Sequence, residues 1–202
     1  MKTIALALIL VSSVVANTVT LTMDEVPLQP INGLTVSKGG ENFTFSNRWG
    51  ILLYNSSGPG NVTFVQDPSI QGTAAPFGIA FSDPVFSIQF GLAESSLSSI
   101  APLATVELYY NSLVPFATMS FNSSLVDPFA EGQFNYSGGP VSNILIWPNA
   151  GPALAFDNLT VNTVPEPSSF LTLAGAAALA AARIFKQRHR RNGKLCQRSG
   201  DL

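Results

Sequence analysis

Apolar and polar residues alternate along most of the chain between Asn17 and Val164. A period of two is typical of strands with one buried face. The segments with this period are 18–23, 34–36, 43–45, 49–54, 62–65, 77–81, 85–90, 105–110, 116–121, 133–136, 141–147 and 153–161. Glycine, proline and asparagine, which form tight reversals, separate them. So many short strands predict an all-β fold, either an antiparallel β-sandwich or a barrel.

The connections between these strands fit the same prediction. Residues 66–76 are predicted as a long polar loop, and the serine-rich residues 92–100 as a loop or a single helical turn. Ser82-Asp83-Pro84 divides two strands, because proline cannot donate a hydrogen bond to a ladder. No window before Phe170 has the pattern of a long amphipathic helix.

The 14 phenylalanines of the chain are the main core candidates. Most lie at alternate positions of predicted strands, where they would fill the space between two sheets. A few exposed rings could instead stack on sugar rings, and the pattern leaves open which rings, if any, are exposed. We predict core for the set as a whole.

Charge is scarce between Asn17 and Val164. That stretch holds two basic residues, Lys38 and Arg48, and ten acidic ones, a net charge of −8. Such a body repels nucleic acid, which requires clustered lysine and arginine to neutralise phosphates, so we predict no nucleic-acid partner. The stretch is one domain's worth of chain. Its core has no disulfide, because the single cysteine is Cys196.

No catalytic set is predicted. The single histidine, His189, lies near the C-terminus, which excludes a Ser-His-Asp or Cys-His arrangement and a zinc cage from the body. A carboxylate pair among Glu94, Glu107 and Glu131 could hydrolyse a glycoside, but isolated solvated acids are the simpler interpretation. We therefore predict that the protein is not an enzyme.

Residues 1–16 have the pattern of a signal peptide. Lys2 gives a positive start, Ile4–Val11 an apolar run, and Val14–Ala16 small residues before a cleavage site. We predict passage through the Sec translocon and cleavage by signal peptidase between Ala16 and Asn17. An uncleaved membrane anchor and a buried first strand are the alternatives, but the apolar run is short for a membrane span.

Two further features follow the body. Val164–Pro167 contains two residues that each precede a proline, which favours an extended, exposed segment. Residues 170–182 hold no charge and would make a helix of about 20 Å, against a hydrocarbon core of about 30 Å. Extension from 167 to 185 gives about 28 Å if Arg183 reaches the interface with its charged end. We predict one short C-terminal transmembrane helix whose insertion is marginal.

A basic cluster accompanies the end of this helix. Its members are Arg183, Lys186, Arg188, Arg190 and Arg191. By the positive-inside rule the cluster stays in the cytoplasm together with the short tail 192–202, and the body lies on the other side of the membrane.

The order of these parts over Val164–Arg191 resembles the PEP-CTERM sorting signal of Gram-negative bacteria. The resemblance implies a precursor that is held transiently in the inner membrane, with its body in the periplasm, and is processed by an exosortase. Pro165, Glu166 and Pro167, with Val164 before them, would be the recognised motif, and the basic cluster would stop transfer. The resemblance also implies delivery to the cell surface or the extracellular matrix, in a biofilm or exopolysaccharide context. Eleven residues follow Arg191, where family members often end sooner.

Residues 17–163 resemble the jelly-roll body of such exported proteins. Residues 24–36 are similar to its opening and residues 155–161 to its closing strand. The resemblance implies a jelly-roll-like β-sandwich. It also makes a structural calcium ion a candidate, since jelly-roll modules often hold one near where their first and last strands meet, and hard cations prefer oxygen ligands. The candidate ligands are Asp24, Glu25, Glu41 and Asp157, and no cofactor is otherwise required.

We therefore predict an exported, non-enzymatic surface or matrix protein that is adhesive or glycan-binding, with polysaccharide as its candidate partner. A secreted carbohydrate-active enzyme with the same tail and a permanently tail-anchored envelope protein are the alternatives. Sequons that match the N-glycosylation rule begin at Asn42, Asn55, Asn61, Asn122, Asn135 and Asn158. The abundance of asparagine and threonine at turns and on wet strand faces accounts for these sequons without glycans.

Overall fold

The computed structural model describes residues 17–60, 62–126, 128–149 and 151–163. The chain divides into two compact units, Met1–Pro165 and Glu166–Leu202, and all of the described residues belong to the first. The predicted signal peptide with Ala16, the sorting motif, the C-terminal helix, the basic cluster and the tail 192–202 lie outside the described residues. Among the residues that are described, no helix is long and apolar enough to cross a membrane.

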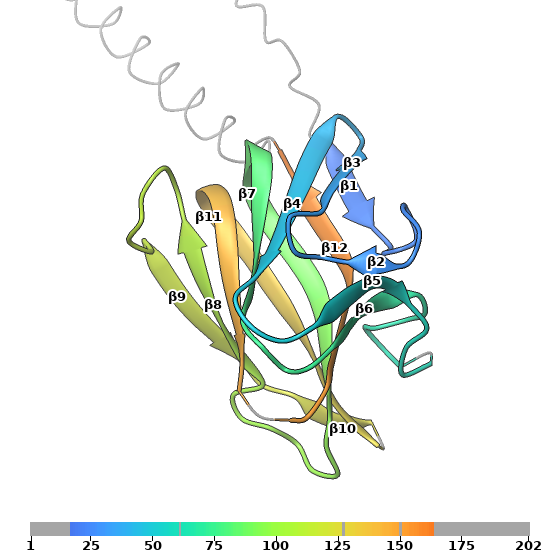
Figure 1. Ribbon diagram of the computed structural model, residues 1–202. Helices are drawn as coiled ribbons and strands as arrows, with labels where there is room; N and C mark the ends of the chain where they lie inside the picture. The colour runs from blue at the N-terminus through green and yellow to red at the C-terminus, as the bar shows by residue number, and fades with distance from the viewer. Residues whose placement is uncertain (1–16, 61, 127, 150, 164–202) are drawn as a thin grey trace, which may run out of the picture. The chain divides into compact units, whose positions relative to one another are not determined.

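The described chain forms antiparallel β-strands (Figure 1). They are β1 (Thr18–Leu21), β2 (Gln29–Pro30), β3 (Thr35–Lys38), β4 (Glu41–Asn47), β5 (Leu52–Ser56), β6 (Ser69–Gly72), β7 (Phe77–Ser95), β8 (Ala104–Tyr109), β9 (Ala117–Phe121), β10 (Ser124–Val126), β11 (Phe129–Pro148) and β12 (Leu154–Asn162). This confirms the predicted all-β fold.

The strands share one hydrogen-bonded sheet that folds into two layers, because β7 and β11 serve both layers. Residues 77–81 of β7 pair with β4, whereas residues 87–94 pair with β12. The first layer contains β3, β4, the start of β7, the end of β11, β8 and β9. The second layer contains β2, β5, β6, β12, β1, the end of β7, the start of β11 and β10. The result is the predicted jelly-roll-like sandwich.

The paired strands β7 and β11 pass from one layer to the other at a bend, where their register shifts (Figure 1). The bend in β7 lies at Ser82-Asp83-Pro84. The predicted break between two strands at this point is wrong, because β7 continues through it from Phe77 to Ser95. Glu41 is 1% exposed, and its Oε1 accepts hydrogen bonds from the Ser82 N–H at 2.5 Å and the Asp83 N–H at 3.1 Å. The carboxylate thus satisfies two backbone donors that leave the ladder at the bend.

Phenylalanine fills the space between the layers, as predicted. Phe77 from the first layer and Phe156 from the second meet edge to face, with ring centroids 5.2 Å apart. Phe90 stacks on Phe134 at 5.0 Å, and both are buried. Burial of each such ring contributes roughly 1.5–3 kcal/mol. Among the described phenylalanines, Phe116 is the one whose side chain is exposed, at 50%.

Three further local predictions are wrong. Residues 62–65 form no strand, residues 66–76 contain β6, and β7 continues to Ser95 through part of the predicted loop at 92–100. The first error has a plain cause. The N–H groups of Thr63, Phe64 and Val65 bind the carboxylate of Glu131 at 2.5–2.9 Å and not a neighbouring strand.

Residues 62–66 lie on the outer face of the second layer. Val65 is buried there against Ala93 and Ala155 in a small second core. Gly91 permits the close approach, because a Cβ at this position would lie 2.2 Å from the Phe64 carbonyl oxygen. The chain's own loop therefore covers part of the outer face of the second layer.

Candidate functional site

The outer face of the first layer carries a different set of side chains. Strand register places Ser46, Gly78, Leu145 and Glu107 in one row across β4, β7, β11 and β8. The next row holds Thr44, Ala80, Asn143 and Tyr109. Alternate residues of the same strands point into the core, since successive side chains of a strand face opposite sides. The small residues at the centre of both rows leave the middle of this face low.

A hollow of about 490 Å³ lies on this face. Its floor comes from β4, β7 and β11, and its rim from the end of β8 and the loop that follows. Its lining includes Ser46, Arg48, Gly78, Tyr109, Leu113 and Asn143. The lining thus combines small, apolar, hydroxyl, amide and guanidinium groups. Arg48 is the one charged side chain among the described residues that line the hollow.

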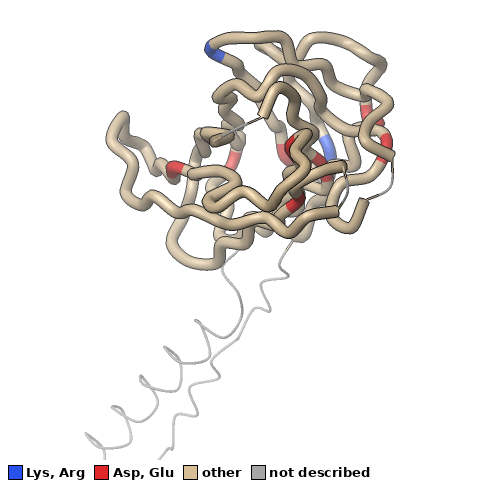
Figure 2. The backbone as a smooth tube through the Cα atoms, turned by 90° about the horizontal axis from the view of Figure 1, so that it is seen from below, with Lys and Arg blue, Asp and Glu red and all other residues tan. Residues whose placement is uncertain are grey.

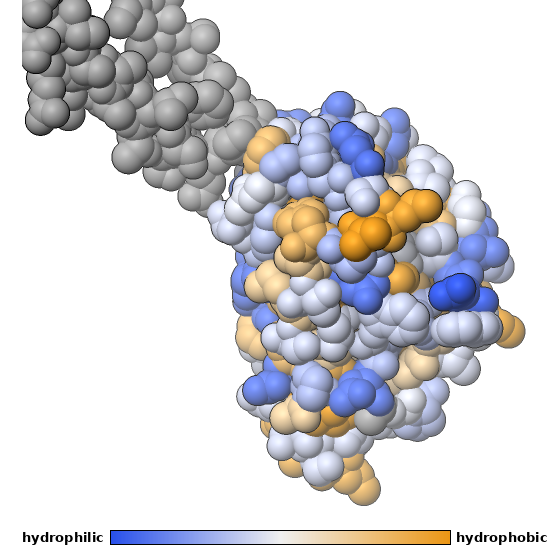
Figure 3. All heavy atoms as spheres, turned by 90° about the vertical axis from the view of Figure 1, so that its left-hand side faces the viewer, coloured by the Kyte–Doolittle hydropathy of each residue, from blue (hydrophilic) through white to orange (hydrophobic). Residues whose placement is uncertain are grey.

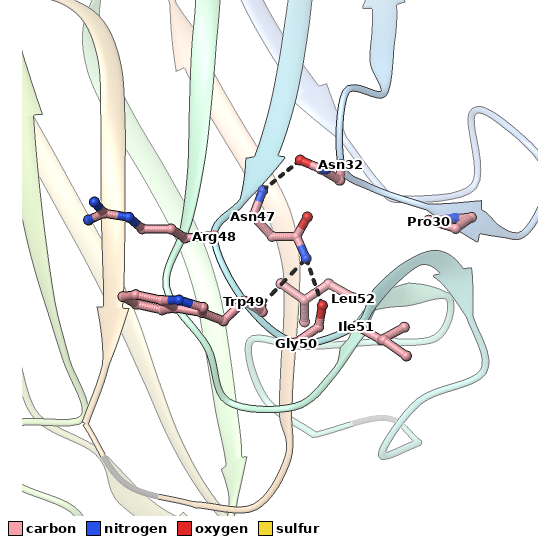
Figure 4. A pocket seen from close by; sticks show the side chains of 8 residues that line it. All are labelled: Pro30, Asn32, Asn47, Arg48, Trp49, Gly50, Ile51 and Leu52. Atoms are coloured by element: carbon pink, nitrogen blue, oxygen red, sulfur yellow. Dashed lines mark hydrogen bonds between the residues drawn. The ribbon is translucent and has the colours of Figure 1, made fainter.

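A second hollow of about 370 Å³ is formed around the loop between β4 and β5 (Figure 4). Trp49 is 56% exposed, and the Arg48 guanidinium carbon lies 5.3 Å from the centre of its ring. Asn47 fixes the loop, because its Nδ2 donates to the Gly50 carbonyl at 3.0 Å. Gly50 has a φ of +76° and a Cβ there would lie 2.2 Å from Thr73 Oγ1, so the turn requires glycine.

Arg48 lines both hollows. The body has only one other basic residue, Lys38, which forms an ion pair with Glu25 at 2.6 Å. Figure 2 shows how sparse the basic positions are among the acidic ones. The Arg48 guanidinium and the Trp49 ring together offer hydrogen-bond donors beside a flat apolar surface. This pair suits a ligand that has both acceptor oxygens and a flat apolar face.

The three glutamates considered for glycoside hydrolysis are not brought together. Glu131 lies on the outer face of the second layer and is paired in register with Ala93 of β7. Glu94 is the next residue after Ala93, so the carboxylates of Glu131 and Glu94 point to opposite faces of the sheet. Both are buried, so the expectation of solvated acids is wrong for Glu94 and Glu131.

Glu107 belongs to the first layer and accepts a hydrogen bond from the Tyr109 hydroxyl at 2.6 Å. That hydrogen bond, together with partial burial and the charge of Glu107, raises the pKa of Tyr109 to about 12. Tyr109 therefore stays a neutral donor at the rim of the first hollow.

The four calcium candidates all accept hydrogen bonds within the protein. Glu41 is at the bend, and Asp24 accepts a hydrogen bond from Thr22 Oγ1 at 2.7 Å. Glu25 accepts from Lys38 at 2.6 Å and from the Tyr54 hydroxyl at 2.5 Å. Burial alone would raise the pKa of Glu25, but these hydrogen bonds lower it to about 2.

Asp157 is 2% exposed and accepts a hydrogen bond from the Gln66 N–H at 3.0 Å. Burial, and then the charges of Glu25 and Asp24, raise its pKa to about 6, so these three acids influence one another. No group of three or more histidine, cysteine, aspartate or glutamate side chains in the described ranges could hold a metal ion. The calcium ion stays a prediction without a ligand set.

Asn17, the residue after the predicted signal-peptide cleavage, is described and exposed. Its carbonyl oxygen accepts a hydrogen bond from the Thr163 N–H at 3.3 Å, and β1 pairs with β12 from Thr18 opposite Asn162. The first residues of the body and the last ones before the predicted sorting motif therefore lie side by side.

Comparison with known proteins identifies the C-terminal segment. Residues 163–191 match the PEP-CTERM protein-sorting motif. The chain therefore carries a sorting signal that indicates an exported protein processed at the membrane. No curated protein matches the chain.

Solved structures with similar folds include carbohydrate-binding modules. A mutant of the family 29 module CBM29-2 has a TM-score of 0.40 and 10% identity, over 74% of this chain and 94% of that one. The xylan-binding module CBM86 from Roseburia intestinalis has a TM-score of 0.36 and 12% identity, over 71% and 93%. The family 29 module CBM29_1 from Piromyces equi has a TM-score of 0.35 and 12% identity, over 69% and 92%.

Proposed function

We propose that this chain is a cell-surface or extracellular-matrix protein that an exosortase processes at its sorting motif, and that its body binds glycans without catalysis. The match over residues 163–191 supports the sorting part of the proposal. The exposed Arg48–Trp49 pair beside the open hollow supports the binding part.

In the sorting step, the Sec translocon carries the chain across the inner membrane and signal peptidase cleaves after Ala16. Val164, Pro165, Glu166 and Pro167 form the segment that the exosortase recognises, while the body is in the periplasm. The helix and the basic cluster Arg183, Lys186, Arg188, Arg190 and Arg191 hold the precursor transiently in the inner membrane. A helix of marginal length suits a temporary hold better than a permanent one.

Replacement of Pro165, Glu166 and Pro167 by alanine in the full-length chain tests the sorting step in its host cell. We expect an unprocessed precursor that stays in the membrane fraction, as measured by immunoblots of membrane, surface and medium. Replacement of Ser168 and Ser169 by alanine is the matched control and should leave processing unchanged. Normal processing of the triple variant would contradict the proposal, and a wild-type chain that stays at full length would favour a permanent anchor.

The binding step uses the chemistry of sugar rings. The C–H face of a pyranose packs on an aromatic surface, and its hydroxyl groups accept hydrogen bonds from a guanidinium. Trp49 supplies such a surface at 56% exposure, and Arg48 supplies the donors. Ser46, Asn143 and the Tyr109 hydroxyl add polar groups along the neighbouring hollow. A polysaccharide chain that crosses β4, β7, β11 and β8 would contact all of them.

A panel of neutral and acidic polysaccharides, followed by calorimetric titration with the oligosaccharide that binds best, tests this step. Trp49→Ala should weaken binding about tenfold, because an aromatic contact contributes roughly 0.5–1.5 kcal/mol. Leu97→Ala is the control, since Leu97 is 82% exposed and lines neither hollow. Equal binding by Trp49→Ala would contradict the site. Hydrolysis of the oligosaccharide that Glu107→Gln abolishes would favour a carbohydrate-active enzyme.

A further inference from the structure

Strand β9 is one of the two free edges of the first layer, since in the described chain Ala117–Phe121 pair only with β8; β3, which pairs only with β4, is the other edge. An edge strand presents unpaired N–H and C=O groups, and proteins often protect such edges with charged side chains. Residues 108–126 contain no charged residue, although Glu107 and Asp127 flank them directly. This edge therefore lacks the usual protection against strand pairing.

Apolar side chains gather beside the same edge. Five of the ten exposed large hydrophobic residues in the described chain lie between 110 and 119, and they are Tyr110, Leu113, Val114, Phe116 and Met119. Leu113 is 99% exposed and Val114 71%. Figure 3 shows hydrophobic side chains clustered on this side of the molecule, the left-hand side of Figure 1, where β8, β9 and their connecting loop lie.

The distribution of charge selects what can pair with this edge. Two copies of a body with a net charge of −8 repel each other over most of their surface. They meet without close charge repulsion where neither copy carries charge, and residues 108–126 form such a stretch. The unpaired backbone groups of β9 require another strand edge as their complement, and a second copy supplies one of the same length.

We propose that β9 pairs antiparallel with β9 of a second copy, centred on Met119, so that two first layers join into one sheet. In this register Thr118 lies opposite the partner's Ser120. Hydroxyl pairs of this kind already join strands on the outer faces, as Thr105 with Ser120 at 3.0 Å and Thr35 with Thr44 at 3.0 Å. On the inner side, Met119 meets its own counterpart. The pairing is thus self-complementary, as a two-fold interface requires.

The contact is small. A strand of five residues is about 17 Å long, so the paired edges bury less surface than a standard stable interface. The dimer therefore depends on concentration, and it becomes populated where exported copies accumulate at a surface. Neither hollow includes Met119, so the dimer and the glycan site can be tested separately.

A charge swap at Met119 tests the pairing. The full-length chain is solubilised in mild detergent with Cys196→Ser, and its dimerisation is followed by sedimentation velocity over a range of concentrations. We expect Met119→Lys and Met119→Asp each to raise the dimer dissociation constant about tenfold or more, because like charges then face each other directly. An equimolar mixture of the two variants should dimerise again, since lysine then faces aspartate. Met119 is 36% exposed, so both variants should keep the fold, as checked by circular dichroism.

A second experiment tests the register. In the Cys196→Ser background, Met119→Cys should form an intermolecular disulfide under mild oxidation, whereas Thr118→Cys and Leu97→Cys should form far less. Association that both single variants retain, a mixture that stays monomeric, or equal crosslinking at 118 and 119 would overturn the proposal. A chain that is monomeric at every concentration but binds phosphatidylethanolamine–phosphatidylglycerol vesicles would overturn it too, and would assign the apolar residues to a membrane surface.

Discussion

The two outer faces of the sandwich contrast in what covers them. The chain's own residues 62–66 cover part of the outer face of the second layer, and Glu131 and Asp157 accept hydrogen bonds from the backbone of that segment. Within the described residues, no such segment covers the hollow of the first layer, and Arg48 and Trp49 lie at its margin. One face is closed by internal hydrogen bonds, and the other presents side chains to solvent.

The difference between the two faces shows that some of the acidic residues have a role inside the fold. Four acids in the described chain are buried, and Glu41, Glu131 and Asp157 among them accept hydrogen bonds from backbone N–H groups. Their carboxylates therefore replace strand partners where the backbone leaves a ladder. A net charge of −8 thus describes in part how the fold is held and not only what its surface attracts or repels.

Removal of the Glu131 carboxylate should release residues 62–66 from the second layer, and we expect it to have the largest effect on stability. Glu131→Ala leaves the N–H groups of Thr63, Phe64 and Val65 without their acceptor, so we expect the free energy of unfolding to fall by about 3 kcal/mol. Urea denaturation at pH 7.5 measures it. Faster proteolysis within 57–68 should accompany the loss, because the cover opens first.

Two variants serve as controls for this prediction. Glu131→Gln keeps one acceptor oxygen and should lose less stability than Glu131→Ala. Glu107→Ala removes an acid from the open face, where its partner in the described chain is the Tyr109 hydroxyl, and should change the free energy of unfolding by less than about 1 kcal/mol. Equal losses for Glu131→Ala and Glu107→Ala would show that the cover is not held by its carboxylate.

The local sequence predicts which side of each strand is buried. Phe43, Phe45 and Ile79 alternate with polar or small residues, and all three are in the core, because a period of two fixes the face. The same rule fails at Val62–Val65, where Val62, Thr63 and Phe64 alternate in the same way but form no strand. The acceptor for the N–H groups of this segment is Glu131, 66 residues from Val65 along the chain, and no local pattern contains that contact.

The candidate site is only partly visible in the sequence. Arg48 is one of two basic residues in the body and lies directly before Trp49, the first residue of the predicted strand 49–54, so composition alone could have marked this pair. The hollow could not be predicted, because the register of four strands that are distant in sequence brings Ser46, Gly78 and Asn143 together. The positions of the acidic residues in the sequence likewise did not distinguish candidate metal ligands from acids that accept hydrogen bonds from backbone N–H groups.

The sequons illustrate how structure decides between two interpretations of one pattern. Asn55 and Asn158 adopt φ values of 56° and 55°, which asparagine tolerates better than most residues. Their side-chain amides donate to the Val26 carbonyl at 2.8 Å and to the Phe64 carbonyl at 3.1 Å. A glycan on either nitrogen would disturb this hydrogen bond, so at these two positions the turn explains the asparagine.

Asp157 is the other acid that binds residues 62–66, and removal of its charge has the smallest expected effect on the free energy of unfolding. The effect has the opposite sign to that of Glu131→Ala, because it stabilises the fold. The Asp157 pKa of about 6 in the folded chain lies above the usual value of 3.8, so the fold favours the protonated form. Ionised Asp157 therefore costs stability above pH 6, and the cost disappears as the pH falls through 6 towards 3.8. Asp157→Asn keeps an acceptor for the Gln66 N–H without the charge. We expect it to raise the free energy of unfolding at pH 7.5 by about 1–2 kcal/mol.

Denaturation at several pH values between 5 and 7.5 checks this prediction. The difference between Asp157→Asn and the parent should be largest at pH 7.5 and shrink towards pH 5, where Asp157 becomes protonated. Glu25 does not interfere, because its pKa of about 2 keeps it ionised throughout this range and its stabilising hydrogen bonds are lost only below the usual pKa of 4.5. A gain that is the same at every pH would place the effect in packing and not in ionisation. A loss at pH 7.5 would mean that the Asp157 charge holds residues 62–66 as strongly as Glu131 does, and that both acids are needed to close this face.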